Sequence, residues 1–264
     1  MSQKIREHVQ KLLAENKIKG FLGLREENGH IQPYLFCDPE ELNHLSTGDR
    51  RKPGDARYPL NQLLIRLASE YPQETFAVLI RGCDERGLNE LFKWKQLSKE
   101  RVIPIGIGCP DELAEACECE KPFPDCMVEG PKGEKRDSQK VAQIDQMALE
   151  DRLRRWKKEF DRCIKCLGCR NICPMCFCKE CTLEEANLID TGEIPPANPS
   201  FHLVRAIHMA GRCIDCGLCE EACPAEIPLR TLYKKVAQIV SEEFGYKTGL
   251  SEEEKSPFNI IEVK

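Results

Sequence analysis

Residues 163–174 read CIKCLGCRNICP and residues 213–224 read CIDCGLCEEACP, so one pattern of four cysteines and a proline occurs twice. In each copy two residues separate the first three cysteines, three residues precede the fourth, and proline follows at once. Two-residue spacing lets the backbone wrap a bound group, so that three thiols converge and the fourth points away. Proline ends the wrap because it lacks an N–H and has a fixed φ. The repeat therefore predicts two equivalent four-thiol units.

This spacing is typical of runs that bind cubane 4Fe-4S clusters, in which the fourth cysteine of each run ligates the other run's cluster. On that rule we expect cluster one at Cys163, Cys166, Cys169 and Cys223, and cluster two at Cys213, Cys216, Cys219 and Cys173. The alternatives are zinc sites and disulfide bonds. Zinc sites use separate C-x-x-C pairs and disulfides need an oxidising compartment, so the sequence favours 4Fe-4S clusters over both. The pattern predicts one-electron transfer between two neighbouring clusters.

Composition narrows the function classes further. The 264 residues carry 17 cysteines and a net charge of −5, which argues against nucleic acid as a partner. The charged segment 1–10 lacks the apolar centre of a signal peptide, and no apolar run reaches the length of a membrane span. We therefore expect a cytoplasmic protein without a membrane span, with its thiols reduced or bound to metal, in an anaerobic metabolism.

Residues 1–127 predict an α/β domain with a parallel βαβ core. The dipeptide Asn28-Gly29 between two apolar runs is typical of a β-hairpin. Farther along, a strand, a helix capped by Asp84 and a second strand alternate, as in a parallel sheet. The expected elements are a helix at 5–13, strands at 19–24 and 31–36, a helix at 59–71, a strand at 76–80, a helix at 84–96 and a strand at 101–107.

The rest of the chain predicts an α-helical domain around the two cysteine runs. Residues 128–140 have the composition of a linker, with two glycines, a proline and mixed charges. Residues 141–245 form the expected helical domain, and residues 246–264 a polar, loosely ordered tail. The expected elements of the helical domain are helices at 141–160, 201–211 and 229–244, and an irregular stretch at 194–199.

Four cysteines of the first domain predict a candidate third cluster. Cys83 and Cys109 each follow a strand of the βαβ unit, and the carboxyl ends of neighbouring parallel strands share one crevice. Cys117 and Cys119 lie shortly downstream, so four thiols in this crevice would fit a third 4Fe-4S cluster, with Cys126 as the reserve ligand. The alternative is that Cys83 and Cys109 are buried structural residues and that Cys117 and Cys119 are exposed.

The remaining cysteines allow two interpretations. Cys176, Cys178 and Cys181 directly follow the first run, and they predict either part of a further metal site or small residues buried under the first cluster. Cys37 is expected in the core. No Ser-His-Asp, paired-carboxylate or phosphate-loop constellation is present, and no third glycine completes the G-x-G at 106–108. We therefore predict no catalytic residues.

Several segments resemble known families. The cluster domain at roughly 141–245 resembles the α-helical ferredoxin domains of heterodisulfide reductase C subunits and of succinate dehydrogenase iron–sulfur subunits. Its segment HLVRAIHMAGRC at 202–213 is especially similar to the heterodisulfide reductase type. The segments LIRGCDERGLNEL at 79–91, VIPIGIGCP at 102–110, CEKP at 119–122 and CLGCRNICPMCFC at 166–178 resemble the beta-subunit family of coenzyme F(420) hydrogenases and formate dehydrogenases. The resemblances imply an α/β N-terminal domain joined to an α-helical ferredoxin domain that holds two 4Fe-4S clusters.

The second family uses FAD and iron–sulfur clusters to pass electrons to a deazaflavin or to a partner. In this chain a helical dicluster ferredoxin follows the shared segment, in place of the family's larger flavin-binding portion. The resemblance therefore favours an electron-transfer subunit in a hetero-oligomer with hydrogenase, formate dehydrogenase or heterodisulfide-reductase-like subunits. The alternative is a catalytic subunit that binds FAD and reduces coenzyme F(420) or a related acceptor. In a third interpretation the first domain is a docking scaffold.

Overall fold

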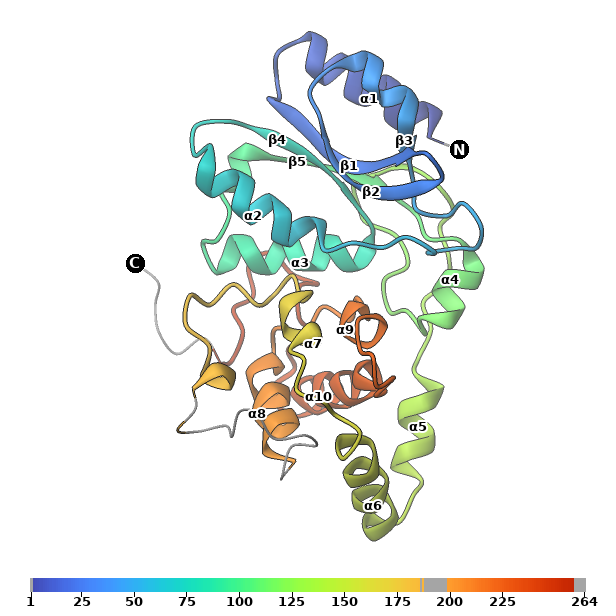
Figure 1. Cartoon of the computed structure of the whole chain (residues 1–264), viewed down its shortest axis with the longest axis vertical. Coiled ribbons are helices and arrows are strands. Elements are labelled where there is room, and N and C mark those ends of the chain that lie inside the picture. The colour runs from blue at the N-terminus through green and yellow to red at the C-terminus, as the bar shows by residue number, and fades with distance from the viewer. Residues whose placement is uncertain (1, 186, 188–198, 259–264) are drawn as a thin grey trace. The chain divides into compact units, whose positions relative to one another are not determined.

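The computed structural model describes residues 2–185, 187 and 199–258 (Figure 1). These residues form two compact units, an α/β unit and a helical unit, with the division between Asp137 and Ser138. The division lies within the segment 128–140 that has linker composition. In the described ranges no helix combines the length and the apolar character that a membrane crossing requires.

A mixed, mostly parallel sheet is the centre of the first unit. Its strands lie in the order β2-β1-β4-β5-β6, and β3 pairs with β1. β1 is antiparallel to β2 and β3, whereas β4 is parallel to both β1 and β5, and β5 is parallel to β6. The predicted parallel βαβ core is therefore confirmed. The strands are β1 (Gly20–Glu27), β2 (His30–Phe36), β3 (Leu45–Ser46), β4 (Phe76–Ile80), β5 (Val102–Ile107) and β6 (Met127–Glu129).

The hairpin between β1 and β2 turns at Asn28 and Gly29. Their φ angles of 51° and 82° are both positive, as a two-residue type I′ turn requires. Because the turn fixes the register, Glu27 lies opposite His30 and Phe21 lies opposite Phe36. The predicted hairpin is confirmed, and its two phenylalanines stack in the core with ring centroids 5.9 Å apart.

Helices cover both faces of this sheet. Figure 1 shows α1 on one face and α2 and α3 on the other, with α2 packed against β4 and β1. Every residue of β4 is buried, as expected for a parallel strand covered on both sides. The helices are α1 (Gln3–Ala14), α2 (Leu60–Glu70), α3 (Gly82–Lys93) and α4 (Asp111–Ala116), with short 3-10 helices η1 (Pro39–His44) and η2 (Lys99–Arg101).

Three details of the first unit differ from the sequence-based expectation. Asp84 lies at the third position of α3 instead of at its N-cap, and its carboxylate accepts a hydrogen bond from the N–H of Arg81 (3.0 Å). Cys37 is exposed, because it follows Phe36, the inward-facing end of β2, and side chains alternate along a strand. β6 adds a parallel strand whose last two residues fall within the expected linker.

The second unit consists of helices around two short helical turns. α10 packs against α5, α8 and α9, and α7 packs against α9. The elements are α5 (Gln139–Asp145), α6 (Leu149–Phe160), α7 (Gly168–Asn171), η3 (Thr182–Glu184), α8 (Ser200–Met209), α9 (Leu218–Glu221) and α10 (Leu229–Phe244). Apart from Pro199, the irregular stretch expected at 194–199 lies outside the described residues.

Two expectations for the second unit are wrong. The helix expected at 141–160 is two helices, because the buried residues Ile144 and Phe160 would lie on nearly opposite faces of one straight helix. The segment after α10 is not a loose tail in its described part. Tyr246 is 2% exposed and Ser256 is 5% exposed, and the Ser256 side chain lies over Gly211.

Candidate metal centres

The two cysteine runs have the same backbone conformation. Lys165 and Asp215 occupy equivalent positions with φ of 51° and 58°, and Leu167 and Gly217 do so with φ of 58° and 78°. After each wrap a four-residue helix, α7 or α9, carries the third cysteine. Residues other than glycine adopt positive φ at an energetic cost, and such positions cluster at ligand-binding sites. The repeated sequence therefore forms two equivalent wraps.

The first group of thiols combines three cysteines of run one with the last cysteine of run two. Burial raises the pKa of Cys163, and the nearby Cys223 and Cys166 thiols raise it further, while the Lys165 N–H lowers it. Burial also raises the pKa of Cys169, which the Cys163, Cys166 and Cys223 thiols raise further. The structure thus brings together Cys163, Cys166, Cys169 and Cys223, the set that the sequence assigns to cluster one.

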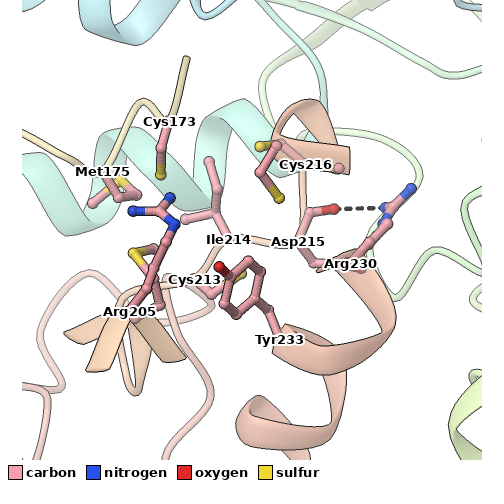
Figure 2. A pocket seen from close by; sticks show the side chains of 12 residues that line it. Cys173, Met175, Arg205, Cys213, Ile214, Asp215, Cys216, Arg230 and Tyr233 are labelled. Carbon is pink, nitrogen blue, oxygen red and sulfur yellow. Dashed lines mark hydrogen bonds and ion pairs between the residues drawn. The ribbon is translucent and has the colours of Figure 1, made fainter. Parts of the chain in front are cut away.

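The second group lines a single cavity. Cys173, Cys213, Cys216 and Cys219, the set that the sequence assigns to cluster two, all contribute to its wall (Figure 2). Burial raises the pKa of Cys219 well above its ordinary value, and the Cys216 and Cys213 thiols add to the rise. Cys173 comes from the first run, so each run sends its fourth cysteine to the thiols of the other.

A pair of cations holds the loop of the second wrap. The Asp215 carboxylate accepts a hydrogen bond from Nε of Arg230 (2.8 Å) and pairs with Nζ of Lys234 (2.6 Å), both on α10. Nη2 of Arg230 also donates to the Asp215 backbone carbonyl (2.6 Å). Because Asp215 lies between Cys213 and Cys216, these contacts fix the loop that orients both thiols.

The three cysteines after the first run have different surroundings. A hydrogen bond from the Cys173 thiol lowers the pKa of Cys176 to about 5, and its Sγ also accepts one from Nη1 of Arg205 (3.3 Å). Cys178 is exposed, with its Sγ 4.0 Å from Nη1 of Arg212, and Cys181 is half-buried before η3. Within the described ranges no three His, Cys, Asp or Glu side chains form a site for one metal ion. A cubane differs because its four ligands bind four separate irons.

In the first unit three of the four predicted thiols are buried together. Cys109, Cys117 and Cys119 form one buried cluster with Leu113 of α4, whereas Cys83 is half-buried at the start of α3. The expectation that Cys117 and Cys119 are exposed if no cluster is present is therefore wrong. Burial raises the pKa of Cys126 to about 12, and the Glu85 carboxylate contributes to the rise.

Close packing of the backbone holds the loops at this edge of the sheet. Gly82 precedes Cys83, and a Cβ at this position would overlap the carbonyl oxygen of Lys121. Gly108 precedes Cys109 in the same way, and a Cβ there would overlap the carbonyl oxygen of Pro131. Both candidate cysteines thus follow a glycine that allows another segment to cross directly above it.

A buried arginine lies beside the thiol of Cys109 in this unit. Arg81 is 7% exposed, and its Nη2 contacts both carboxylate oxygens of Asp49 at 2.9 and 2.8 Å. Burial raises the pKa of Cys109, and the Arg81 guanidinium opposes that rise. The sequence does not predict this burial, because a single arginine after a strand is more often solvated.

The donor sets fit 4Fe-4S clusters. Each group in the second unit supplies four thiols from two interleaved loops, and the ionic groups beside them include the cations Arg205 and Arg230. A cluster with four thiolates is an anion, so buried cations beside it compensate its charge. The sequence does not single out Arg205, although its spacing from Phe201 and Met209 places it on the buried face of α8.

These wraps define the class of the second unit. Residues 206–228, which contain the second cysteine run, match the 4Fe-4S binding domain family. The chain therefore carries a 4Fe-4S binding domain, as predicted.

The relatives of the chain extend this result. It is 43% identical over 108 residues to the F420-dependent formate dehydrogenase subunit beta of Methanocaldococcus jannaschii, which covers 41% of this chain and 28% of the relative. It is 45% identical over 98 residues to the F420-dependent formate dehydrogenase 1 subunit beta of Methanococcus maripaludis, which covers 37% of this chain and 25% of the relative. The chain is thus homologous to these beta subunits over about a quarter of their length, and the predicted resemblance is confirmed there.

Proposed function

We propose that this chain is an iron–sulfur electron-transfer subunit of a multi-subunit redox complex and holds two 4Fe-4S clusters. The observation that carries the proposal is the exchange of fourth cysteines: Cys223 lies with the thiols of run one, and Cys173 with those of run two. Each cluster supplies one-electron uptake and release when bound. The chain's own residues hold the two clusters in a fixed relationship and shield them from water.

The burial of the thiols supports a relay with one accessible end. In the first group Cys163 and Cys169 are buried, whereas Cys166 is exposed. In the second group Cys219 and Cys173 are buried, and Cys213 and Cys216 are half-buried. Solvent exposure is one of the factors that set the reduction potential of a cluster. Because the thiols of the two sites differ in exposure, we expect the two clusters to differ in reduction potential. This arrangement suits transfer between clusters within one unit.

The names of the relatives support a particular kind of complex. Both are beta subunits of F420-dependent formate dehydrogenases, so in these relatives the homologous segment belongs to a subunit of a redox enzyme. We propose partners of the formate dehydrogenase, hydrogenase or heterodisulfide reductase type. The names of the relatives are also compatible with the alternative, an FAD-binding subunit that reduces coenzyme F(420). A search for bound flavin distinguishes this alternative from an electron-transfer subunit.

The first unit contributes a candidate third cluster to this proposal. Three buried thiols, Cys109, Cys117 and Cys119, support it, and Cys83 completes the set of four. The guanidinium of Arg81 beside Cys109 is suited to compensate the negative charge of a cluster there. A further metal site at Cys176, Cys178 and Cys181 stays a prediction. The Sγ of Cys176 is hydrogen-bonded to the thiol of Cys173.

Metal analysis of the full chain, purified under strictly anaerobic conditions, tests the proposal. Two clusters correspond to about eight irons per chain and three clusters to about twelve, with matching acid-labile sulfide. Electron paramagnetic resonance of the dithionite-reduced protein should show two interacting 4Fe-4S signals. Fewer than about six irons would contradict the two-cluster proposal, and a stoichiometric flavin would favour the catalytic alternative.

Single substitutions separate the third site from the other two. Cys109→Ser should lower the iron content from about twelve to about eight if the first unit holds a cluster. Cys37→Ser is the matched control, because Cys37 is an exposed cysteine of the same unit. An iron content that is equal in both variants and in the unmodified chain would refute the third cluster. The proposal of two clusters in the second unit would be unaffected.

A further inference from the structure

Arg205 is a buried cation that lies beside both the first and the second group of cysteines. It lies on α8 with 2% of its surface exposed. Its Nη2 donates to the backbone carbonyl of Cys169 in the first group (2.7 Å), and the residue also lines the cavity of the second group. Figure 2 shows the guanidinium directed toward Cys173 and Met175, with the ring of Tyr233 beside it.

The charge of Arg205 is not compensated by a carboxylate among the residues that the structure describes. The Nη1 of Arg205 donates to the Sγ of Cys176 (3.3 Å), and its guanidinium lies 5.8 Å from the centre of the Tyr233 ring. Its Nε is buried and has no hydrogen-bond partner in the described part of the chain. A buried cation is strongly disfavoured unless negative charge lies beside it. The missing negative charge is that of thiolates and of the clusters that they would bind.

We propose that Arg205 sets the reduction potentials of both clusters by placing one buried positive charge against the two cluster sites. The inference rests on the proposed function, because it requires that the clusters are present. On reduction each cluster takes up one electron, supplied by dithionite in the experiment below, and its negative charge increases by one. The fixed cation stabilises the reduced form more than the oxidised form, so it raises both potentials.

The structure favours Arg205 over the other cations of this unit for that role. Arg230 shares the Asp215 carboxylate with Lys234, so its charge is partly compensated, and it lines the cavity of the second group. Arg212 lies over the ring of Phe177 and beside the exposed Cys178, where water screens charges. Arg205 combines burial with contacts to a ligand's backbone, to Cys176 and to the cavity wall.

Redox titration followed by paramagnetic resonance tests the inference with two substitutions. Arg205→Gln removes the charge, and at a fixed solution potential it should lower the ratio of reduced to oxidised cluster at least tenfold, about 59 mV for a one-electron couple. Arg205→Lys keeps the charge and should restore most of the potential. Arg155→Gln is the control, because it removes an equal charge from an exposed position on α6.

The outcomes distinguish this inference from the proposed function. If the unmodified chain binds no iron, the proposed function fails. If Arg205→Gln holds full iron and its potentials are those of the unmodified chain, only the role of Arg205 fails. If Arg205→Gln loses its clusters, the Lys variant decides: full iron with potentials near the unmodified values supports the electrostatic role, whereas a tenfold shift or cluster loss shows that Arg205 is only structural.

Discussion

The ring of Phe160 stacks on the ring of His202, with centroids 4.5 Å apart and planes 12° from parallel. Phe160 ends α6, three residues before the first cysteine run, and His202 lies in the first turn of α8. Both side chains are buried. The stack therefore ties the start of the first wrap to the helix that carries Arg205.

His202 should make stability depend on pH. Burial, with a smaller effect of Arg205, lowers its pKa from 6.5 to about 4. The folded chain holds this proton less tightly than the unfolded chain, so the stabilisation is complete above pH 6.5 and is lost as the pH falls toward 4. Each unit in that window costs up to about 1.4 kcal/mol. His202→Phe should flatten the slope of the unfolding free energy measured from pH 7.5 to 5.5.

A histidine on the exposed side of the same helix provides the control for that measurement. His208→Phe also removes one histidine from α8, and it should keep the slope of the unmodified chain. An equal loss of slope in both variants would assign the pH dependence to another group.

The exchange of fourth cysteines predicts paired losses. Cys223→Ser should remove the cluster held with Cys163, and Cys173→Ser should remove the one held with Cys219. Each variant should retain about four fewer irons than the unmodified chain. Comparison with Cys166→Ser and Cys216→Ser by paramagnetic resonance identifies the missing cluster. If Cys223→Ser resembles Cys216→Ser, the exchange does not occur.

Asp215 should be needed for the second wrap. Asp215→Asn leaves Arg230 and Lys234 without their shared carboxylate, and all three side chains are about one-eighth exposed. The loss of one partner of a buried pair typically costs roughly 3 to 5 kcal/mol. We expect a lower Tm and a faster loss of one cluster to a chelator. The exposed Asp151→Asn on α6 is the matched change, and an equal effect there would refute the role of this pairing.

Gly82 should be required for the edge of the sheet in the first unit. Gly82→Ala places a methyl group against the carbonyl oxygen of Lys121, so the chain must shift, at a cost of about 1–3 kcal/mol. If a third cluster is present, its iron should be lost first. Gly133→Ala adds the same methyl group with only moderate contacts. Equal Tm values for the two variants would show that the crossing over Gly82 adapts without strain.

The sequence predicts most elements of both units because their signals are local. The turn at Asn28, the apolar run of β4 and the helical phase of α10 each depend on neighbouring residues only. The break between α5 and α6 could have been read from Ile144 and Phe160, which would face opposite ways on one straight helix. The exposure of Cys37 could not be predicted as easily, since it depends on which face of β2 is covered.

The residues of the candidate sites also fall into two groups: those that the sequence identifies and those that only the fold brings together. The eight cysteines of the two runs are recognisable because their spacing is itself the chemical signal. Arg205 gives no such signal, because its role depends on three segments that are distant in sequence, around Cys169, Cys176 and Tyr233. The buried Arg81–Asp49 pair is likewise a product of folding, since 32 residues separate the two side chains.

The repeated backbone of the two wraps has a consequence for maturation. Leu167 and Gly217 both adopt positive φ, but only glycine does so without strain. The empty first wrap should therefore open more readily than the second, and iron and sulfide should enter the second run first. Hydrogen exchange of the iron-free chain should show faster exchange at residues 163–173 than at 213–223. The difference between Leu167 and Gly217 at one equivalent position would thus order the two insertion events.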